Sequence, residues 1–286
     1  MMADKPEKTT TETVGMKQIA MPGTNRVLLC HAGFHRAASS SIQVFLEENR
    51  DKLTDLGWSV ILRKDLKETP ALLGIRRGHW RDRYLPTWFA RLFRVVRHLK
   101  GRSPSILVSE ENLLGHMPSV KDDFIYPRAG ATILFLKMIA WLTNRRLIIL
   151  LVTRDEDDWR RSIWAFRKLR DETRDSESFS KALTGSLQKT TSLVRRKLGK
   201  DLYELPLSDL TANTLRTLLG LEVCDDEQLA RRNTAQPDHV LEQLHRLQTA
   251  GIDVHDKRIR DTLLPRLRKT DQPLSIEEAI KLVDDA

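Results

Sequence analysis

The stretch from Val27 to Leu46 constrains the fold of this chain more than any other part of the sequence. It opens with an apolar run that stops at Gly33, and three consecutive serines follow at positions 39–41. From Ile42 onward, apolar residues recur at helical spacing, which predicts a helix that begins at the serines. Backbone N–H groups at the start of a helix have no partner within it and carry partial positive charge, so this loop suits a phosphate or sulfate group.

Further apolar segments predict strands at 58–62, 105–109, 147–152 and 201–205. Helical patterns between and after them predict helices at 131–143, 155–171 and 208–219, and a capping box at 275–278 predicts a short final helix. Strands that alternate with helices form mainly parallel sheets with right-handed crossovers. We therefore expect an α/β fold in which helices flank a mainly parallel central sheet in three layers.

Composition narrows the class of partner. A net charge of +9 and a pI of about 9.7 favour anionic partners. The 2 cysteines are too few for a disulfide framework, and no cysteine or histidine spacing predicts a metal site. Residues 1–24 are polar, lack the apolar centre of a signal peptide, and are expected to form a disordered tail. The apolar stretches are too short to span a bilayer, so we expect a cytoplasmic protein.

The segment 69–103 combines arginines with aromatic residues. Six of its apolar residues fall on one face of a predicted helix, with arginines on the other: Leu85, Trp88, Phe89, Leu92, Phe93 and Val96. Such a helix either covers the core and leaves its basic face in solvent, or contacts a membrane surface or an acidic polymer. The sequence leaves both interpretations open.

The loop Gly33-Phe-His-Arg-Ala-Ala-Ser-Ser-Ser41 resembles the 5′-phosphosulfate-binding loop of sulfotransferases that use 3′-phosphoadenosine 5′-phosphosulfate (PAPS), especially bacterial members. Arg36 stands where that family has lysine, and Ala37 where threonine is usual. A Walker A loop fits poorly, because Ala38 occupies the position before its lysine and Ser39 the position of the lysine itself. An ordinary strand-to-helix turn is the alternative.

Two later segments extend the resemblance. Arg154 and Ser162, eight positions apart, resemble the arginine and serine that bind the 3′-phosphate in this family. Arginine offers a planar fork to a phosphate, and a serine hydroxyl adds a hydrogen bond. Leu218-Leu-Gly-Leu221, followed by Arg231 and Arg232, resembles a family element near the nucleotide.

The general base has four candidates. Ser109-Glu110 ends a predicted strand, and some sulfotransferases carry a Ser-Glu pair here whose glutamate is the base. Glu111 is adjacent, and His35 and His116 are rivals because histidine titrates near neutral pH. Gly33, Ser109 and Arg154 all follow apolar strands, so a parallel sheet would bring them to one edge.

The resemblance implies a P-loop NTPase-like sulfotransferase fold and transfer of a sulfuryl group from PAPS to a hydroxyl of a carbohydrate, lipid or other small acceptor. The product nucleotide would be adenosine 3′,5′-bisphosphate (PAP), with no metal. The acceptor is expected to be acidic or glycosidic; oligomeric state is open. The implied domains are a sulfotransferase-like domain at 25–252, with the basic segment inserted, and a helical extension at 253–286. The implied catalytic residues are Arg36, Glu110 and His35. The implied nucleotide-binding residues are Gly33, Arg36, Ala37, Ala38, Ser39, Ser40, Ser41, Arg154, Ser162, Arg231 and Arg232.

Two alternatives remain. Because Arg36 replaces lysine, the chain is alternatively a catalytically impaired relative that binds PAP or an acidic glycan. It is otherwise a basic binder of nucleic acid or of a membrane surface that uses residues 76–102, of which we favour the membrane contact.

Overall fold

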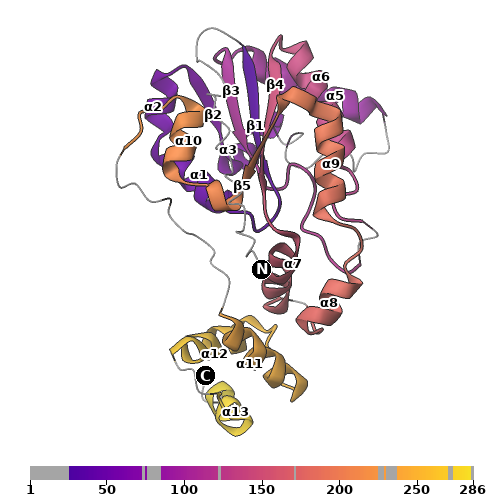
Figure 1. The fold of residues 1–286 in the computed structure, drawn as a ribbon, viewed down its shortest axis with the longest axis vertical. Helices are drawn as coiled ribbons and strands as arrows, with labels where there is room; N and C mark the ends of the chain where they lie inside the picture. Colours follow the sequence, from indigo (N-terminus) through magenta and orange to yellow (C-terminus); the bar gives the residue numbers. More distant parts are fainter. Residues whose placement is uncertain are drawn as a thin grey trace, which may run out of the picture.

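A five-stranded parallel sheet forms the centre of the protein (Figure 1). The computed structural model describes residues 26–72, 75, 85–121, 124–170, 172–224, 229, 237–269 and 273–284. The strands are β1 (Val27–Gly33), β2 (Trp58–Ile61), β3 (Ser105–Ser109), β4 (Arg146–Thr153) and β5 (Leu202–Pro206), in the order β2-β3-β1-β4-β5. All four strand pairs are parallel, which confirms the predicted α/β fold.

The two central strands explain why apolar runs predicted this sheet so well. Every residue of β1 is buried, and β4 is buried from Leu147 to Val152. A parallel strand covered on both faces has no solvent side, so its sequence is continuously apolar rather than alternating. The register pairs Gly33 with Val152 and His31 with Ser109, so the ends of β1, β3 and β4 lie at one edge.

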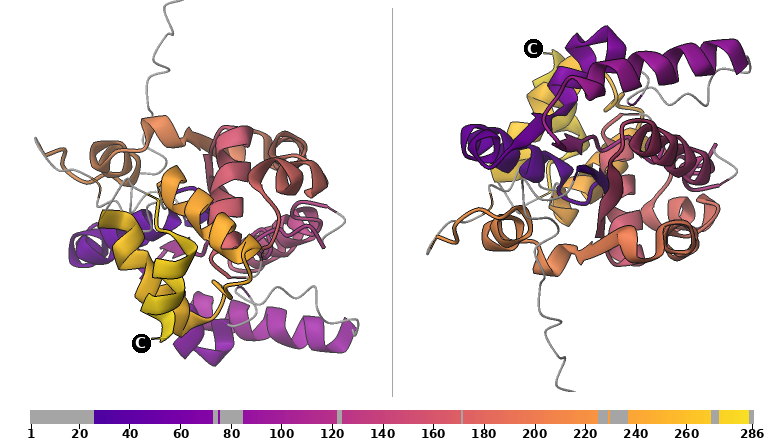
Figure 2. Two further views of the ribbon diagram at one scale, coloured as in Figure 1. Left: turned by 90° about the horizontal axis from the view of Figure 1, so that it is seen from below. Right: turned by 90° about the horizontal axis from the view of Figure 1, so that it is seen from above.

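Helices cover both faces of the sheet (Figure 2). The connections β2 to β3, β3 to β4 and β4 to β5 all advance in one direction across the sheet. Right-handed crossovers therefore place their helices on the same face. These helices are α5 (Leu85–Lys100), α6 (Ala129–Leu142) and α9 (Leu187–Leu198), and α6 contacts both neighbours. The β1-to-β2 connection runs the opposite way, so α1 (Ser39–Glu48) lies on the other face with α10 (Ala212–Leu219).

The remaining helices lie around the strand ends or form a C-terminal group. They are α2 (Arg50–Asp55), α3 (Arg63–Glu68), α7 (Glu156–Lys168), α8 (Ser176–Ala182), α11 (Asp238–Thr249), α12 (Lys257–Lys269) and α13 (Ile276–Asp284), with 3-10 turns at Pro70–Leu72, Gly199–Asp201 and Leu207–Asp209. The predicted capping box is present, since Ser275 N–H donates to Glu278 and Glu278 N–H donates to Ser275 Oγ.

The C-terminal helices α11 to α13 share a small apolar core of their own (Figure 1). Leu244 of α11 packs there with Leu263 and Leu267 of α12, whereas Leu241 joins the main core. A buried lysine ties this unit to α7, because Lys168 Nζ donates to His245 Nδ1 at 2.7 Å. The helix before position 253 thus packs with the helices after it, and the division expected there stays a prediction.

The rotation of α5 bears on the two interpretations left open for this helix. Phe89 is 45% exposed and Phe93 is 63% exposed, whereas a helix that only covers the core would bury both. The buried stripe consists of Leu92, Val95, Val96 and Leu99, with Trp88 half-buried. The helix meets the core along a narrower stripe than its apolar residues could cover, so two aromatic rings are left on the outside.

Parts of two expectations lie outside the described residues, namely the whole tail 1–24 and positions 73–74 and 76–84 of the basic segment. Within the part of the chain that the structure describes, no helix is long and apolar enough to cross a bilayer.

Candidate functional site

The loop between β1 and α1 is a tight turn in which two residues other than glycine have a left-handed backbone conformation. Arg36 and Ala38 adopt left-handed backbone angles, with φ of 68° and 55°. Ala37 N–H donates to the carbonyl of Phe34 at 3.0 Å and closes the turn. Gly33 is required for space: a Cβ there would lie 2.5 Å from Ser39 Oγ. The end of β1 therefore lies close to the side chain of Ser39 in the first turn of α1.

Two side chains, one following β4 and one in α7, donate hydrogen bonds to carbonyl groups of this loop. Trp159 Nε1 donates to the carbonyl of His35 at 2.9 Å, and Arg154 Nη1 donates to the carbonyl of Arg36 at 3.0 Å. Asp155 caps α7 by accepting from two backbone N–H groups of its first turn. The cap fixes where α7 begins, so Trp159 and Arg154 approach the loop from a defined direction.

Three predicted phosphate-binding residues converge here. Arg36 Nε donates to Ser162 Oγ at 3.3 Å, although 126 positions separate them. Burial lowers the pKa of Arg36, and the positive charge of Arg154 lowers it further. The fold thus holds two guanidinium groups within electrostatic reach of each other. Like charges so placed repel, and an anion bound between them would relieve that repulsion.

The start of α1 adds hydrogen-bonding capacity. Its N-cap residue, Ala38, has no side-chain oxygen to cap the helix. Ser39 is 4% exposed, and its Oγ forms no hydrogen bond with any residue that the structure describes. Buried hydroxyls are normally satisfied, so this one marks a place where a ligand oxygen or a water molecule fits. Ser40 is half-buried and Ser41 is buried beside it.

A chain of four side chains fastens the loop to the end of β3. Tyr126 Oη accepts from the backbone N–H of His35 and lies 2.9 Å from His35 Nδ1. His35 Nε2 lies 2.6 Å from Asn112 Oδ1. Asn112 Nδ2 in turn donates to Glu110 Oε1 at 3.0 Å.

These partners assign the tautomer of His35. Asn112 Nδ2 donates to Glu110, so Asn112 Oδ1 faces His35 and accepts from Nε2–H. Nδ1 of the neutral ring then accepts from the hydroxyl of Tyr126. Burial lowers the pKa of His35 to about 4, so the ring is neutral at pH 7. Burial also raises the pKa of Tyr126. Both ring nitrogens are thus occupied within the protein. The catalytic role of His35 stays a prediction, and these bonds favour a positioning role.

The other candidate bases differ in exposure. Glu110 is fully buried, with Arg63 Nε 4.0 Å from its Oε1. Glu111 is half-buried and forms an ion pair with Arg63. His116 is exposed and lies seven positions after the end of β3, and its positive charge contributes to lowering the pKa of His35. The structure brings all four candidates to one edge of the sheet, and the choice among them stays a prediction.

Sequence reasoning missed three residues that shape the site: Asn112, Tyr126 and Trp159. Tyr126 lies in an irregular segment with a left-handed φ of 51°, and no periodic pattern marks it. Trp159 lies between Arg154 and Ser162 in the sequence, and nothing in their spacing indicates that its indole donates to the loop. Arg231 and Arg232 lie outside the described residues, so their predicted place near the nucleotide is untested.

Surface hollows occur elsewhere on the molecule. One of about 410 Å³ is lined by residues of α9, and another of about 320 Å³ lies among α7, α8 and α11. Neither includes a residue of the loop or its partners. Across the described ranges, no cluster of three histidine, cysteine or acidic side chains is placed to hold a metal ion.

Comparison with known proteins adds no family assignment: no protein-family model matches the chain, and no curated protein has a significant sequence match to it.

Proposed function

We propose that this protein binds PAPS at the β1–α1 loop and transfers its sulfuryl group to a hydroxyl-bearing acceptor. One observation carries the proposal: Arg36, Arg154 and Ser162, predicted from separate segments to bind one nucleotide, are joined by contacts of 3.0 and 3.3 Å. A chance strand-to-helix turn would not be expected to gather two arginines and a buried serine. Two phosphates on one small molecule match this set of donors.

The residues divide the work as follows. Arg154 and Ser162 would hold the 3′-phosphate, and Arg36 with the start of α1 would hold the 5′-phosphate. Because Arg36 already contacts Ser162, the two phosphate positions adjoin. The hydroxyl of Ser39 would find in the ligand the partner that the described protein atoms do not provide.

PAPS supplies a sulfuryl group activated by its bond to phosphate. The acceptor oxygen forms a new bond to sulfur while the bond from sulfur to the bridging oxygen breaks, and that electron pair stays on the departing phosphate. Arg36 and the helix N-terminus stabilise this developing charge. The acceptor proton goes to a carboxylate, for which Glu110 and Glu111 are the candidates. Positioning and charge stabilisation then supply most of the rate enhancement.

Thermal denaturation in the presence of PAP tests the binding step. A ligand that binds only the folded state stabilises it by about 2.7 kcal/mol at 100 times its Kd. We expect Arg154→Gln and Ser162→Ala to lose most of the shift. Arg161→Gln is the matched control, because Arg161 is an exposed arginine on α7, the helix that carries Ser162. Equal shifts in all three variants, or none in the wild type, would refute nucleotide binding at this site.

Transfer of radiolabelled sulfate from PAPS tests the chemical step. Arginine keeps its proton where lysine can release one, so charge stabilisation survives at position 36 but proton donation does not. We expect Arg36→Lys to raise or preserve turnover. A protein that binds PAP but transfers no sulfate to any hydroxyl acceptor, even with Arg36→Lys, would instead be a nucleotide-binding relative without activity.

A further inference from the structure

Large apolar side chains stand exposed on the neighbouring helices α5 and α6. On α5, Phe89 is 45% and Phe93 is 63% exposed; on α6, Leu134 is 57% and Trp141 is 77% exposed. Trp88 and Phe135, whose rings lie 5.7 Å apart, join the two helices beneath this surface. Single exposed apolar residues are common, but four on two packed helices indicate an interaction surface.

The same helices carry only positive charge. Neither α5, α6 nor the adjacent α9 contains an aspartate or glutamate. Arg94, Arg97 and Lys100 are exposed on α5, and none of them forms an ion pair with another residue that the structure describes. Lys137 is exposed on α6. On most protein surfaces charges of both signs are interspersed, so a helical layer with cations alone is selective for anions.

We propose that the outer face of α5 and α6 docks on the surface of an anionic lipid bilayer. Aromatic and aliphatic side chains gain free energy by entering the interface between headgroups and acyl chains, while arginines bind the lipid phosphates. The exposed stripe of α5 contains both kinds of residue within three turns, from Phe89 to Lys100.

Other occupants fit this face less well. A second copy of the chain would bring two positively charged surfaces together, which costs free energy. A nucleic acid or an acidic polysaccharide would satisfy the arginines and could stack on Trp141. Neither would bury the aliphatic side chain of Leu134 in an apolar medium, which a bilayer does.

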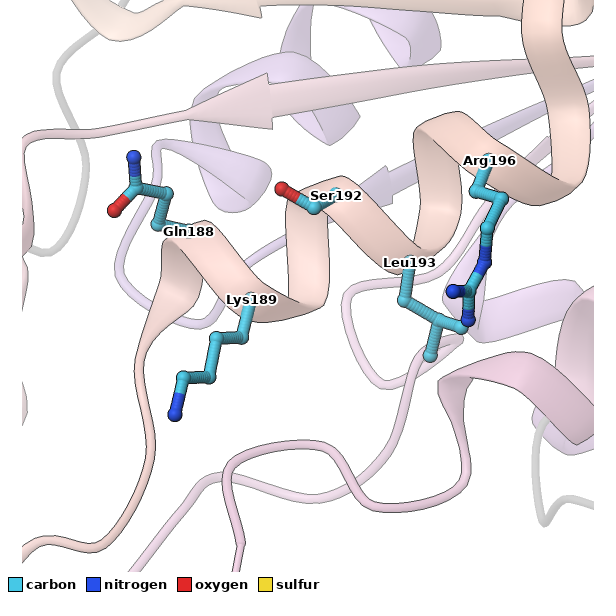
Figure 3. A pocket seen from close by; sticks show the side chains of 5 residues that line it. All are labelled: Gln188, Lys189, Ser192, Leu193 and Arg196. Carbon is cyan, nitrogen blue, oxygen red and sulfur yellow. The ribbon is translucent and has the colours of Figure 1, made fainter.

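The neighbouring helix α9 carries further cations, which Figure 3 shows at a surface hollow. Lys189, Ser192 and Arg196 line it, at positions that fall along one side of the helix. An ammonium, a hydroxyl and a guanidinium suit the phosphate of a lipid headgroup. These helices flank the sheet, whereas the β1–α1 loop lies at the carboxyl ends of the strands (Figure 1). Substitutions on α5 and α6 can therefore weaken lipid docking without changing nucleotide binding at the loop.

Sedimentation of the full chain with vesicles tests the proposal. We expect binding to vesicles of phosphatidylcholine with 30 mol% phosphatidylglycerol, and little binding to phosphatidylcholine alone. At about a fivefold change in partitioning for each surface arginine, Arg94→Gln/Arg97→Gln should weaken binding about 30-fold, and less as the salt concentration rises. Phe93→Ser/Trp141→Ser should weaken it about tenfold or more, because two inserted rings are lost.

The matched control is Lys52→Gln/Lys67→Gln, which removes two exposed positive charges from α2 and α3 and should bind like wild type. A PAP-induced thermal shift or circular dichroism confirms that each variant is folded. Equal binding to both vesicle types would overturn the proposal, as would wild-type binding by the aromatic variant. Binding to RNA or heparin that exceeds vesicle binding, or a dimer that buries this face, would overturn it too.

Discussion

His31 of β1 and His35 of the β1–α1 loop are both buried, so we expect the folded protein to lose stability in mild acid. Burial lowers the pKa of His31 and of His35 to about 4, against 6.5 for an exposed histidine. Both side chains are almost fully buried. As the pH falls below 6.5, the unfolded chain therefore takes up protons that the folded protein does not. The free energy of unfolding is fully maintained above this pH and is lost progressively toward pH 4, where the folded protein also becomes protonated.

The size of the effect follows from the two pKa values. Between pH 7 and pH 5, proton linkage removes about 2 kcal/mol for each histidine, or about 4 kcal/mol for both. Domains of ordinary stability unfold at a cost of about 5–15 kcal/mol, so this is a large share of the total. Urea denaturation followed by tryptophan fluorescence at both pH values measures it.

His31→Asn isolates one contribution, because an asparagine amide can occupy the place of Nδ1, which lies 2.8 Å from Ser109 Oγ. We expect this variant to lose about 2 kcal/mol less than wild type between pH 7 and pH 5. Lys52→Gln, which removes an exposed charge from α2 and keeps both histidines, serves as the control. The reasoning would be refuted if His31→Asn and wild type lost the same stability, or if the His31 ring titrated near pH 6.5 by NMR.

Three further predictions concern other polar groups. Ser39→Ala should leave the urea midpoint nearly unchanged, since no described residue bonds its Oγ, yet it should reduce the thermal shift induced by PAP; a large loss of stability would contradict this. Asn112→Ala should cost about 1–3 kcal/mol in urea denaturation, because it leaves His35 Nε2 without the oxygen it bonds and removes the side-chain donor to Glu110 Oε1, which keeps the backbone N–H of residue 112; wild-type stability would contradict the hydrogen-bond chain. Burial lowers the pKa of Lys168 to about 8 from 10.5, so the unfolded state binds more protons above pH 8 and stability should rise toward pH 10; a Lys168→Met variant should lack this rise.

The sheet was predictable from the sequence because its signal is local. The segments that form β1, β3 and β4 are nearly all apolar, and burial on both faces requires this of each strand separately. Strands that alternate with helices predict parallel pairing, but they do not fix the order of the strands, which only the structure gives. Parallel strands end at the same edge of the sheet. For the same reason, Gly33, Ser109 and Arg154 could be placed at one edge before any contact was known.

The rotation of α5 and the fastening of the loop were not predictable in this way. Phe89 and Phe93 fit an apolar face on a helical wheel, but which residues face the core depends on where the sheet and α6 lie. The bond from Tyr126 to His35 joins positions 91 apart, and a single tyrosine in an irregular segment carries no periodic signal. Such contacts are decided by packing between distant segments, which a local pattern does not encode.

The conformation of Arg36 depends both on the local sequence of the loop and on contacts with distant segments. A left-handed backbone at a residue with a side chain is costly, and so is a second guanidinium nearby. Packing in the hydrophobic core does not offset either cost, because Arg36 is only half-buried and lies at the edge of the sheet. The loop keeps this conformation because Arg154 and Trp159 hold its carbonyl groups and Tyr126 holds its N–H group. Strain that is maintained by so many outside bonds is typical of a site shaped for a ligand, and the ligand that offsets two adjacent positive charges is an anion.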